Sequence, residues 1–179
     1  MTNLIPDLTT ETLRFGFGET TLGIVVVAAS ARGVAALFIG DDRAKLSRDL
    51  KQAFPNAALI LDQTGLEPTL VKATALIDTP HRGTDMALDL RGSETEVAVW
   101  KALQAIPPGE TRSYGVIAKS LAKTLPMAAT AQDVGAACAA NRIAVAVPCH
   151  RVVKADGTIS GYRWGVQRKR RLINMEGVA

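Results

Sequence analysis

The chain has 179 residues, of which 47% are hydrophobic and 21% are charged, and its formal net charge is +4. This composition is typical of a globular protein and excludes an intrinsically disordered chain. The longest apolar runs, GIVVVAA and IAVAV, are too short to cross a bilayer, so neither a membrane-spanning protein nor a membrane partner is expected. The length suits one compact domain, or two small lobes that share a core.

The N-terminal segment and the cysteine count indicate the compartment. The segment MTNLIPDLTTETLRF lacks a basic region followed by an apolar core, so no secretory signal is expected. Two cysteines without such a signal favour a reducing compartment over a disulfide framework. We therefore predict a cytoplasmic protein.

The first half of the chain predicts a small α+β lobe over residues 1–90. Residues 22–40 contain two apolar strands around the turn ASARG, which predicts an antiparallel hairpin. Residues 41–54 begin with two Asp residues and have apolar side chains four apart, which predicts an amphipathic helix. A weaker helix over 68–77 and a short strand over 86–90 are expected to follow.

The second half predicts a mainly helical lobe over residues 91–179. The segment SETE (93–96) has the pattern of a capping box at the start of a helix. Further helices are expected after Ser113, and from a Thr130 cap to Asn141. Two short helices around a turn permit a DNA-binding helix-turn-helix, although an ordinary helical hairpin is the commoner arrangement.

The helix that precedes Asn141 is rich in small residues, including Gly135 and Ala136. Glycine within a helix costs roughly 1 kcal/mol relative to alanine, so a close backbone approach is a reason to keep it. Besides Asn141, this segment offers mainly Gln132 for reading base edges. It therefore suits close contact with a narrow groove better than sequence reading, and tight packing inside the protein is an equally simple explanation.

Basic residues gather toward the C-terminus. Residues 131–179 contain eight Lys or Arg and three acids, a net charge of +5, whereas residues 1–130 have a net charge of −1. A basic C-terminal part suits a polyanionic partner such as nucleic acid, and a solvated basic face is the alternative.

Cys149 and His150 stand side by side in the segment AVAVPCHRVV. A free thiol is only slightly ionised at pH 7, so a nucleophilic Cys149 needs a nearby base or positive charge, for which His150 and Arg151 are local candidates. Neighbouring side chains of a strand point to opposite faces, so a direct Cys149–His150 contact requires a turn or a bridging water. Cys138, Cys149 and His150 lack the spacing of a zinc site, and we predict no metal and no cofactor.

A Gly-bounded aromatic segment follows the cysteine. Tyr162, Arg163 and Trp164 suit the wall of a pocket for a flat ring, and a plug in the core is the alternative. A basic helix over 166–177 is expected after them. Glu176 lies in its last turn, where an acid opposes the helix dipole, and a partner such as His150 would offset that cost.

PCHRVV (148–153), together with SGYRWGVQRKR (160–170), resembles the O6-alkylguanine-DNA alkyltransferase family, and most of all the C-terminal half of the bacterial adaptive-response proteins. The resemblance covers roughly residues 22–178. It also includes VWKAL…IPPGETRSYGVIA and CAAN.

The resemblance implies DNA repair by irreversible, single-turnover transfer of the alkyl group from a flipped O6-alkylguanine, and also from O4-alkylthymine, to Cys149. His150 would be the base that acts through water, Glu176 would orient it, and Asn141 would brace the turn before the cysteine. The base pocket would be formed by Tyr114, which contacts the guanine, and by a lid of Tyr162, Arg163 and Trp164.

The same resemblance implies a monomer that binds double-stranded DNA through the minor groove. The implied DNA contacts are Ser93, Thr95, Ser113, Ala131, Gln132, Gly135, Ala136 and Arg151. Gln132 occupies the place of the arginine finger that the family often has, and Asp133 follows it, so weaker or more salt-sensitive DNA binding is expected. Two cysteines cannot supply the four-cysteine zinc domain of adaptive-response proteins, so only the O6-alkyl activity is expected.

Two other classes of function compete with this interpretation. One is an alkyltransferase-like lesion-binding protein or a helix-turn-helix regulator without efficient transfer, against which the presence of Cys149 argues. The other is a cysteine hydrolase with a Cys-His-Glu triad, which would turn over repeatedly. The stability of an alkyl adduct on Cys149 separates all three.

Overall fold

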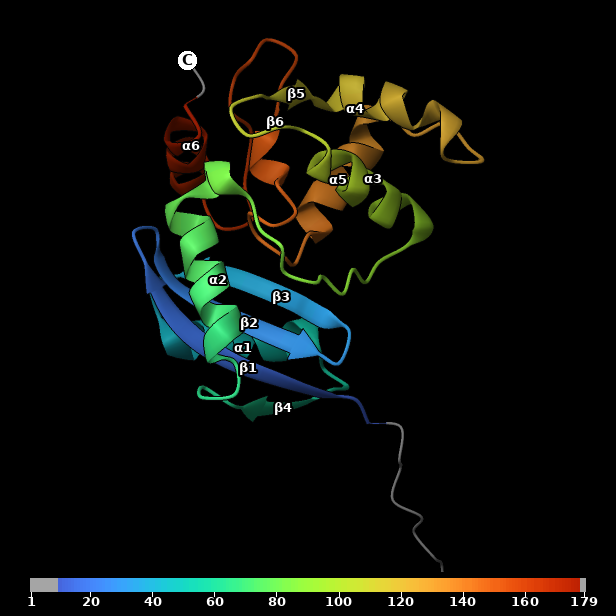
Figure 1. The fold of residues 1–179 in the computed structure, drawn as a ribbon. Coiled ribbons are helices and arrows are strands. Elements are labelled where there is room, and N and C mark those ends of the chain that lie inside the picture. Colours follow the sequence, from blue (N-terminus) through green and yellow to red (C-terminus); the bar gives the residue numbers. More distant parts are fainter. Residues whose placement is uncertain (1–9, 178–179) are drawn as a thin grey trace, which may run out of the picture.

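The computed structural model describes residues 10–177. Residues 1–9, which begin the segment that argues against a secretory signal, lie outside the described residues, as do residues 178–179. In Figure 1 a small sheet with two helices lies below a mainly helical lobe, which contains the C-terminal half of the chain. The expected α+β fold class, an α/β lobe followed by a helical lobe, is confirmed.

The N-terminal lobe is a four-stranded sheet of order β3-β2-β1-β4. Its elements are β1 (Thr12–Thr20), β2 (Gly23–Ser30), β3 (Gly33–Gly40), α1 (Arg43–Ala53), β4 (Ala58–Leu61) and α2 (Glu67–Asp78). β2 is antiparallel to both β1 and β3, which confirms the predicted hairpin, and β4 is parallel to β1. The predicted helices over 41–54 and 68–77 are confirmed as α1 and α2.

The sequence analysis missed β1, because its two glycines, Gly16 and Gly18, weaken a strand pattern. The structure gives the reason for both glycines. A Cβ atom at Gly16 would lie 3.0 Å from Leu70 Cδ1, and one at Gly18 would lie 2.7 Å from Thr74 Cγ2. The glycines therefore let α2 pack directly on this face of the sheet, and α1 lies behind the opposite face (Figure 1).

The predicted strand over 86–90 is wrong. Only Leu88 forms a bridge, to Val34 of β3, with two backbone hydrogen bonds around it. The chain leaves the sheet edge after Asp89, whose amide donates to the Val34 carbonyl and whose side chain accepts hydrogen bonds from Ser30 and Arg91.

The C-terminal lobe contains α3 (Glu94–Gln104), β5 (Arg112–Ser113), α4 (Tyr114–Ser120), α5 (Ala131–Ala140), β6 (Val152–Val153) and α6 (Val166–Met175), with 3-10 turns at Leu121–Lys123 and Cys149–Arg151. Another 3-10 turn, Pro80–Arg82, follows α2 in the N-terminal lobe. The capping box at Ser93 is confirmed, since Ser93 accepts from the amide of Glu96, whose carboxylate accepts from the amide of Ser93. α5 also begins with a capping box, in which the Thr130 amide donates to Asp133 at 2.7 Å. Within residues 10–177, no helix has the length and apolarity needed to cross a membrane.

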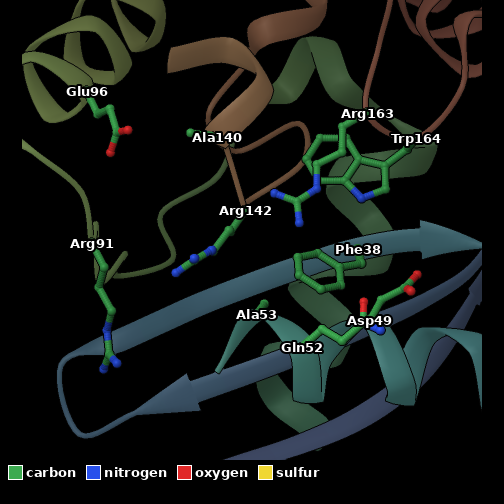
Figure 2. A pocket seen from close by; sticks show the side chains of 10 residues that line it. All are labelled: Phe38, Asp49, Gln52, Ala53, Arg91, Glu96, Ala140, Arg142, Arg163 and Trp164. Atoms are coloured by element: carbon green, nitrogen blue, oxygen red, sulfur yellow. The ribbon is translucent and has the colours of Figure 1, made fainter. Parts of the chain in front are cut away.

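The free edge of β3 joins the two lobes. The Leu37 amide donates to the Arg142 carbonyl at 2.8 Å, and the Ala144 amide donates to the Leu37 carbonyl at 3.0 Å. Figure 2 shows the neighbouring pocket of about 510 Å³ between α1, β3 and the helical lobe, into which Arg142 and Arg163 extend. The N-terminal sheet therefore holds the segment that leads to the cysteine.

Candidate active site

Two three-residue turns precede the cysteine. The Ala146 amide donates to the Ala144 carbonyl at 2.7 Å around Val145, whose φ of 66° is unusual for a β-branched residue. The Cys149 amide donates to the Val147 carbonyl at 2.8 Å around Pro148, whose φ of −82° and ψ of 60° suit such a turn. These turns supply the irregular corner that the sequence analysis required.

Asn141 braces both turns from the end of α5. Its Nδ2 donates to the Val147 carbonyl at 2.9 Å, and its Oδ1 accepts from the Ile143 amide at 2.9 Å. The same Nδ2 lies 3.3 Å from Cys149 Sγ and donates to it. The side chain is buried, and it therefore fixes both the backbone before the cysteine and the sulfur itself.

His150 is fully buried behind the cysteine and contacts the end of α6. Its Nε2 lies 2.8 Å from Glu176 Oε1, and Glu176 is the C-cap of that helix. Arg151 reaches the same carboxylate, with Nη2 2.7 Å from Oε1, and donates through Nη1 to the Ile106 carbonyl. Glu176 therefore has two partners in the site, which offset the cost of an acid at a helix C-terminus.

These contacts determine which atoms of His150 and Glu176 carry a proton. Burial raises the pKa of Glu176, but hydrogen bonds from His150 and Arg151 outweigh it and lower the pKa to about 2. Burial lowers the pKa of His150, so the imidazole is neutral at pH 7. Because an ionised carboxylate only accepts hydrogen bonds, Nε2 carries the proton and Nδ1 keeps its lone pair. His150 Nδ1 is buried and has no hydrogen-bond partner within residues 10–177.

A pocket of about 430 Å³ opens above Cys149. It is lined by Tyr114, Gly135, Cys138, Ala139, Cys149, Gly161, Tyr162, Arg163 and Lys169. Cys138 is half-buried in the wall of this pocket.

The two thiols of the pocket differ in their surroundings. Burial raises the pKa of Cys138 to about 12, and this thiol stays protonated. Burial also raises the pKa of Cys149, but the Asn141 hydrogen bond and the charges of Lys169 and Arg163 act in the opposite direction. Cys149 is therefore the thiol equipped to become a nucleophile. Within residues 10–177, no three His, Cys, Asp or Glu side chains converge as they would around a metal ion.

The sequence analysis missed Lys169, which it counted only as part of a basic helix. Its side chain is 1% exposed and lines the pocket. A signal was present, because Lys169, Leu172 and Ile173 occupy the i, i+3 and i+4 positions of the buried stripe of α6. Lysine is almost never fully buried unless it is paired, so a lysine on a buried stripe indicates a role in the site.

α5 presents a smooth surface beside the pocket mouth. Ala131, Gln132 and Ala136 are exposed, and Gly135 and Ala139 line the pocket one turn apart. A Cβ atom at Gly135 would meet nothing closer than 3.9 Å, which is ordinary contact. Tight packing inside the protein therefore does not explain this glycine. The other explanation, a partner that approaches the backbone of α5 from outside the protein, fits its position.

Comparisons with known proteins point to one family. The family model described as "6-O-methylguanine DNA methyltransferase, DNA binding domain" matches residues 94–178. The inducible methylated-DNA–protein-cysteine methyltransferase of Bacillus subtilis is 33% identical over 162 residues, which cover 90% of this chain and 83% of that protein. The chain belongs to the methylated-DNA–protein-cysteine methyltransferase family.

Other members of this methyltransferase family are also similar. The "Bifunctional transcriptional activator/DNA repair enzyme Ada" of Escherichia coli is 41% identical over 164 residues, which cover 92% of this chain but only 45% of Ada. The chain thus spans less than half the length of this relative. Among solved structures, a Mycobacterium tuberculosis OGT in complex with DNA has a TM-score of 0.72 and 32% identity, and covers 91% of this chain and 92% of that one.

The structure brings together most of the pocket residues that resemblance to the methyltransferase family implied. Tyr114, Tyr162 and Arg163 line the pocket above Cys149. Trp164 does not line it: this buried side chain packs 5.2 Å from the Tyr162 ring and 6.3 Å from the Phe38 ring, between centroids. Figure 2 places Trp164 at the pocket between the lobes, where Arg163 also points.

One of the DNA contacts implied by the methyltransferase resemblance is wrong in this structure. Arg151 is buried, and its guanidinium is occupied by Glu176 and the Ile106 carbonyl, so it does not face an outside partner. Because Lys169 is buried as well, two of the eight C-terminal basic residues do not contribute to a surface patch.

The remaining implied DNA contacts stay predictions. Ser93 and Ser113 both act as helix N-caps, with hydroxyls that accept from Glu96 and Val116 amides. Thr95 is half-buried in the first turn of α3.

Proposed function

We propose that this protein repairs double-stranded DNA by moving the alkyl group of O6-alkylguanine directly onto Cys149. One observation supports this most strongly. The Cys149 thiol lies at the base of a pocket beside the smooth face of α5, and a buried His150–Glu176 pair stands behind it. The pocket volume of about 430 Å³ lies in the range of small-molecule sites and suits a single flipped base.

The first step is deprotonation of Cys149. The free lone pair of His150 Nδ1 takes the thiol proton through one water, and Glu176 stabilises the resulting imidazolium. The Asn141 Nδ2 donor, 3.3 Å from Sγ, stabilises the thiolate as it forms. Arg151 keeps Glu176 ionised and in place beside His150, so its role is to position Glu176 and not to contact DNA.

The second step is displacement at the alkyl carbon. The Cys149 thiolate forms a C–S bond, the C–O6 bond breaks, and its electron pair goes to the guanine, which departs as an anion. The Tyr114 hydroxyl at the pocket wall then protonates the guanine at N3. A thioether is not cleaved by water, so each protein molecule acts once. O4-alkylthymine offers the same alkyl–oxygen bond and is a second substrate.

DNA approaches through its minor groove along α5. Ala131, Ala136 and Gly135 lack side chains that would hold the groove away, and Gly135 and Ala139 also line the pocket. Gln132 lies on the exposed face and fills the gap left by the flipped base, without the charge of an arginine. The protein acts as a monomer in this arrangement, since one chain supplies every group of the site.

Intact-mass spectrometry after incubation with duplex DNA containing O6-methylguanine tests the proposal. We expect one stable adduct of about 14 Da, from addition of CH3 and loss of H, mapped to Cys149 by peptide sequencing and absent in Cys149→Ala. An unmodified protein that binds the modified duplex tightly would instead indicate a lesion-binding protein. An adduct that disappears on standing would indicate a hydrolase.

A further inference from the structure

Two arginines extend into the pocket between the lobes, the cavity of about 510 Å³ shown in Figure 2. Arg142 follows Asn141 at the end of α5, and Arg163 lies in the loop before α6. Neither guanidinium forms an ion pair with a carboxylate among residues 10–177. Arg163 donates one hydrogen bond, from Nη1 to the Asn141 carbonyl at 3.0 Å. Most N–H donors of these two guanidiniums are therefore available to a ligand.

Aromatic rings hold both guanidiniums in place. Arg142 lies over the ring of Phe54, with Cζ 5.1 Å from the ring centroid. Arg163 lies over Phe38 of β3, with Cζ 5.1 Å from that centroid, and also lies 5.8 Å from the centroid of Trp164. Stacking restricts the rotation of each side chain, so less entropy is lost when a ligand binds. The two arginines therefore form a preorganised set of donors.

The two guanidiniums also lie close enough to repel each other. Burial and the charge of Arg142 lower the pKa of Arg163, and the charge of Asp49 offsets them only in part. Two like charges that share a cavity without a bound counter-ion oppose folding, and an anion between them removes that cost. An anion in this pocket would therefore stabilise the folded protein.

The acidic side chains in the pocket wall already have other partners. Asp49 pairs with Lys45 at 2.7 Å, and Glu96 accepts from the Ser93 amide at 3.0 Å in the capping box of α3. Both carboxylates still carry their charge, so a long polyanion lying along this wall would be repelled, whereas a small anion fits between the two arginines. The wall therefore favours a small anion over a chain of phosphates.

We propose that the pocket between the lobes binds a phosphate group through Arg142 and Arg163. Guanidinium N–H groups donate to phosphate oxygens in pairs. A phosphate group carries close to two negative charges at neutral pH, so two guanidiniums match it, whereas a carboxylate carries only one. Gln52 of α1 also lines the pocket, and its amide can donate a further hydrogen bond.

A phosphate in this position would connect the two lobes. Gln52 belongs to the N-terminal lobe, whereas Arg142 and Arg163 belong to the C-terminal lobe, beside the Asn141 side chain that contacts Cys149 Sγ. The proposal goes beyond the proposed function, because phosphate binding is measured without any alkyl transfer. A failure of either one therefore leaves the other standing.

Isothermal titration calorimetry with inorganic phosphate, at an ionic strength held constant with sodium chloride, tests the site. We expect one saturable site with a Kd of about 1 mM in the wild type. Arg142→Gln and Arg163→Gln should each weaken binding at least about tenfold, because each removes a charge-assisted pair of donors. Arg170→Gln is the matched control: it removes the same charge from an exposed position of α6 and should stay within about twofold of the wild type.

Arg142→Lys guards against a variant that fails to fold. It keeps the positive charge and the apolar stem over Phe54, and it should still weaken phosphate binding several-fold, because an ammonium lacks the paired donors. Absence of saturable phosphate binding in the wild type would overturn the proposal. Equal weakening in Arg142→Gln and Arg170→Gln would also overturn it, since that result indicates attraction by the net charge alone.

A second titration distinguishes two sources of the phosphate. The calorimetry is repeated with the protein saturated with unmodified duplex DNA. If the site takes a free phosphate, its affinity is unchanged, and Arg142→Gln leaves the slope of log K for DNA against log salt as in the wild type. If a backbone phosphate of DNA occupies the site, the duplex blocks phosphate binding and Arg142→Gln reduces that slope by about 1. Either result supports the phosphate site, and the acids in the wall predict the first.

Discussion

Replacing Asn141 with alanine should destabilise the protein far more than the loss of one surface amide. The side chain accepts from the Ile143 amide and donates to the Val147 carbonyl, and all three groups are buried. A buried backbone group without a partner costs about 1–3 kcal/mol, and Asn141→Ala leaves the Ile143 amide in that state. The Val147 carbonyl keeps the Cys149 amide and loses one of its two hydrogen bonds, at a cost of about 1 kcal/mol, so the predicted loss in the free energy of unfolding is about 3 kcal/mol.

Urea unfolding followed by circular dichroism measures this loss. For a slope near 2 kcal/mol per M, the unfolding midpoint should fall by about 1.5 M. Asn174→Ala is the matched control, because Asn174 is exposed on α6 and its change should stay within about 0.5 kcal/mol. A second variant, Asn141→Asp, keeps the acceptor for Ile143 but removes the donor to Val147 and to Cys149 Sγ.

Asn141→Asp should therefore recover part of the stability but transfer alkyl groups slowly, since a carboxylate beside the sulfur opposes thiolate formation. If Asn141→Ala lowered the free energy of unfolding by less than about 1 kcal/mol, the two turns would not depend on this amide. The account of how Cys149 is held would then be refuted.

Three further predictions follow from the site. Glu176→Gln should remove part of the acid sensitivity: the folded pKa of about 2 lies below the ordinary 4.5, so the carboxylate contributes up to about 3 kcal/mol above pH 4.5 that is lost as the pH falls toward 2. The difference in urea-unfolding free energy between wild type and variant should shrink from neutral pH to about pH 3, and a constant difference would contradict this. Gly135→Ala should raise the free energy of unfolding by about 1 kcal/mol but weaken DNA binding in fluorescence titrations. Unchanged DNA binding would show that α5 does not face DNA. Gln132→Arg should tighten DNA binding and steepen the dependence of log K on log salt by about 1; an unchanged slope would place residue 132 away from phosphates.

Local signals in the sequence were sufficient for most elements of the fold. The Asp42 cap of α1 and the capping boxes at Ser93 and Thr130 involve groups two to three residues apart. Such contacts depend on the chain itself, and the sequence pattern therefore predicts them. β1 was missed because its glycines are required by close packing against α2, which lies more than fifty residues further along the chain.

The sequence also singled out the residues that we propose as catalytic. Cys149, His150 and Asn141 stand close together in one motif, and the position of Glu176 at an unfavourable helix end indicated that it has a partner. Composition and motifs could not decide which basic side chains are exposed and which are buried. Arg151 was expected at the DNA surface and lies buried against Glu176, and Lys169 was expected in a basic face and lines the pocket above Cys149.

By itself, then, the sequence determined the helix caps and singled out the thiol that we propose as the acceptor, because these depend on neighbouring residues. Only the tertiary structure decided that the edge of β3 holds the segment before Cys149, and that Arg142 and Arg163 extend into one pocket between the lobes. The physical reason is burial. Whether a charged side chain meets water or a buried partner depends on elements packed from distant parts of the chain, and that difference sets its pKa and its role.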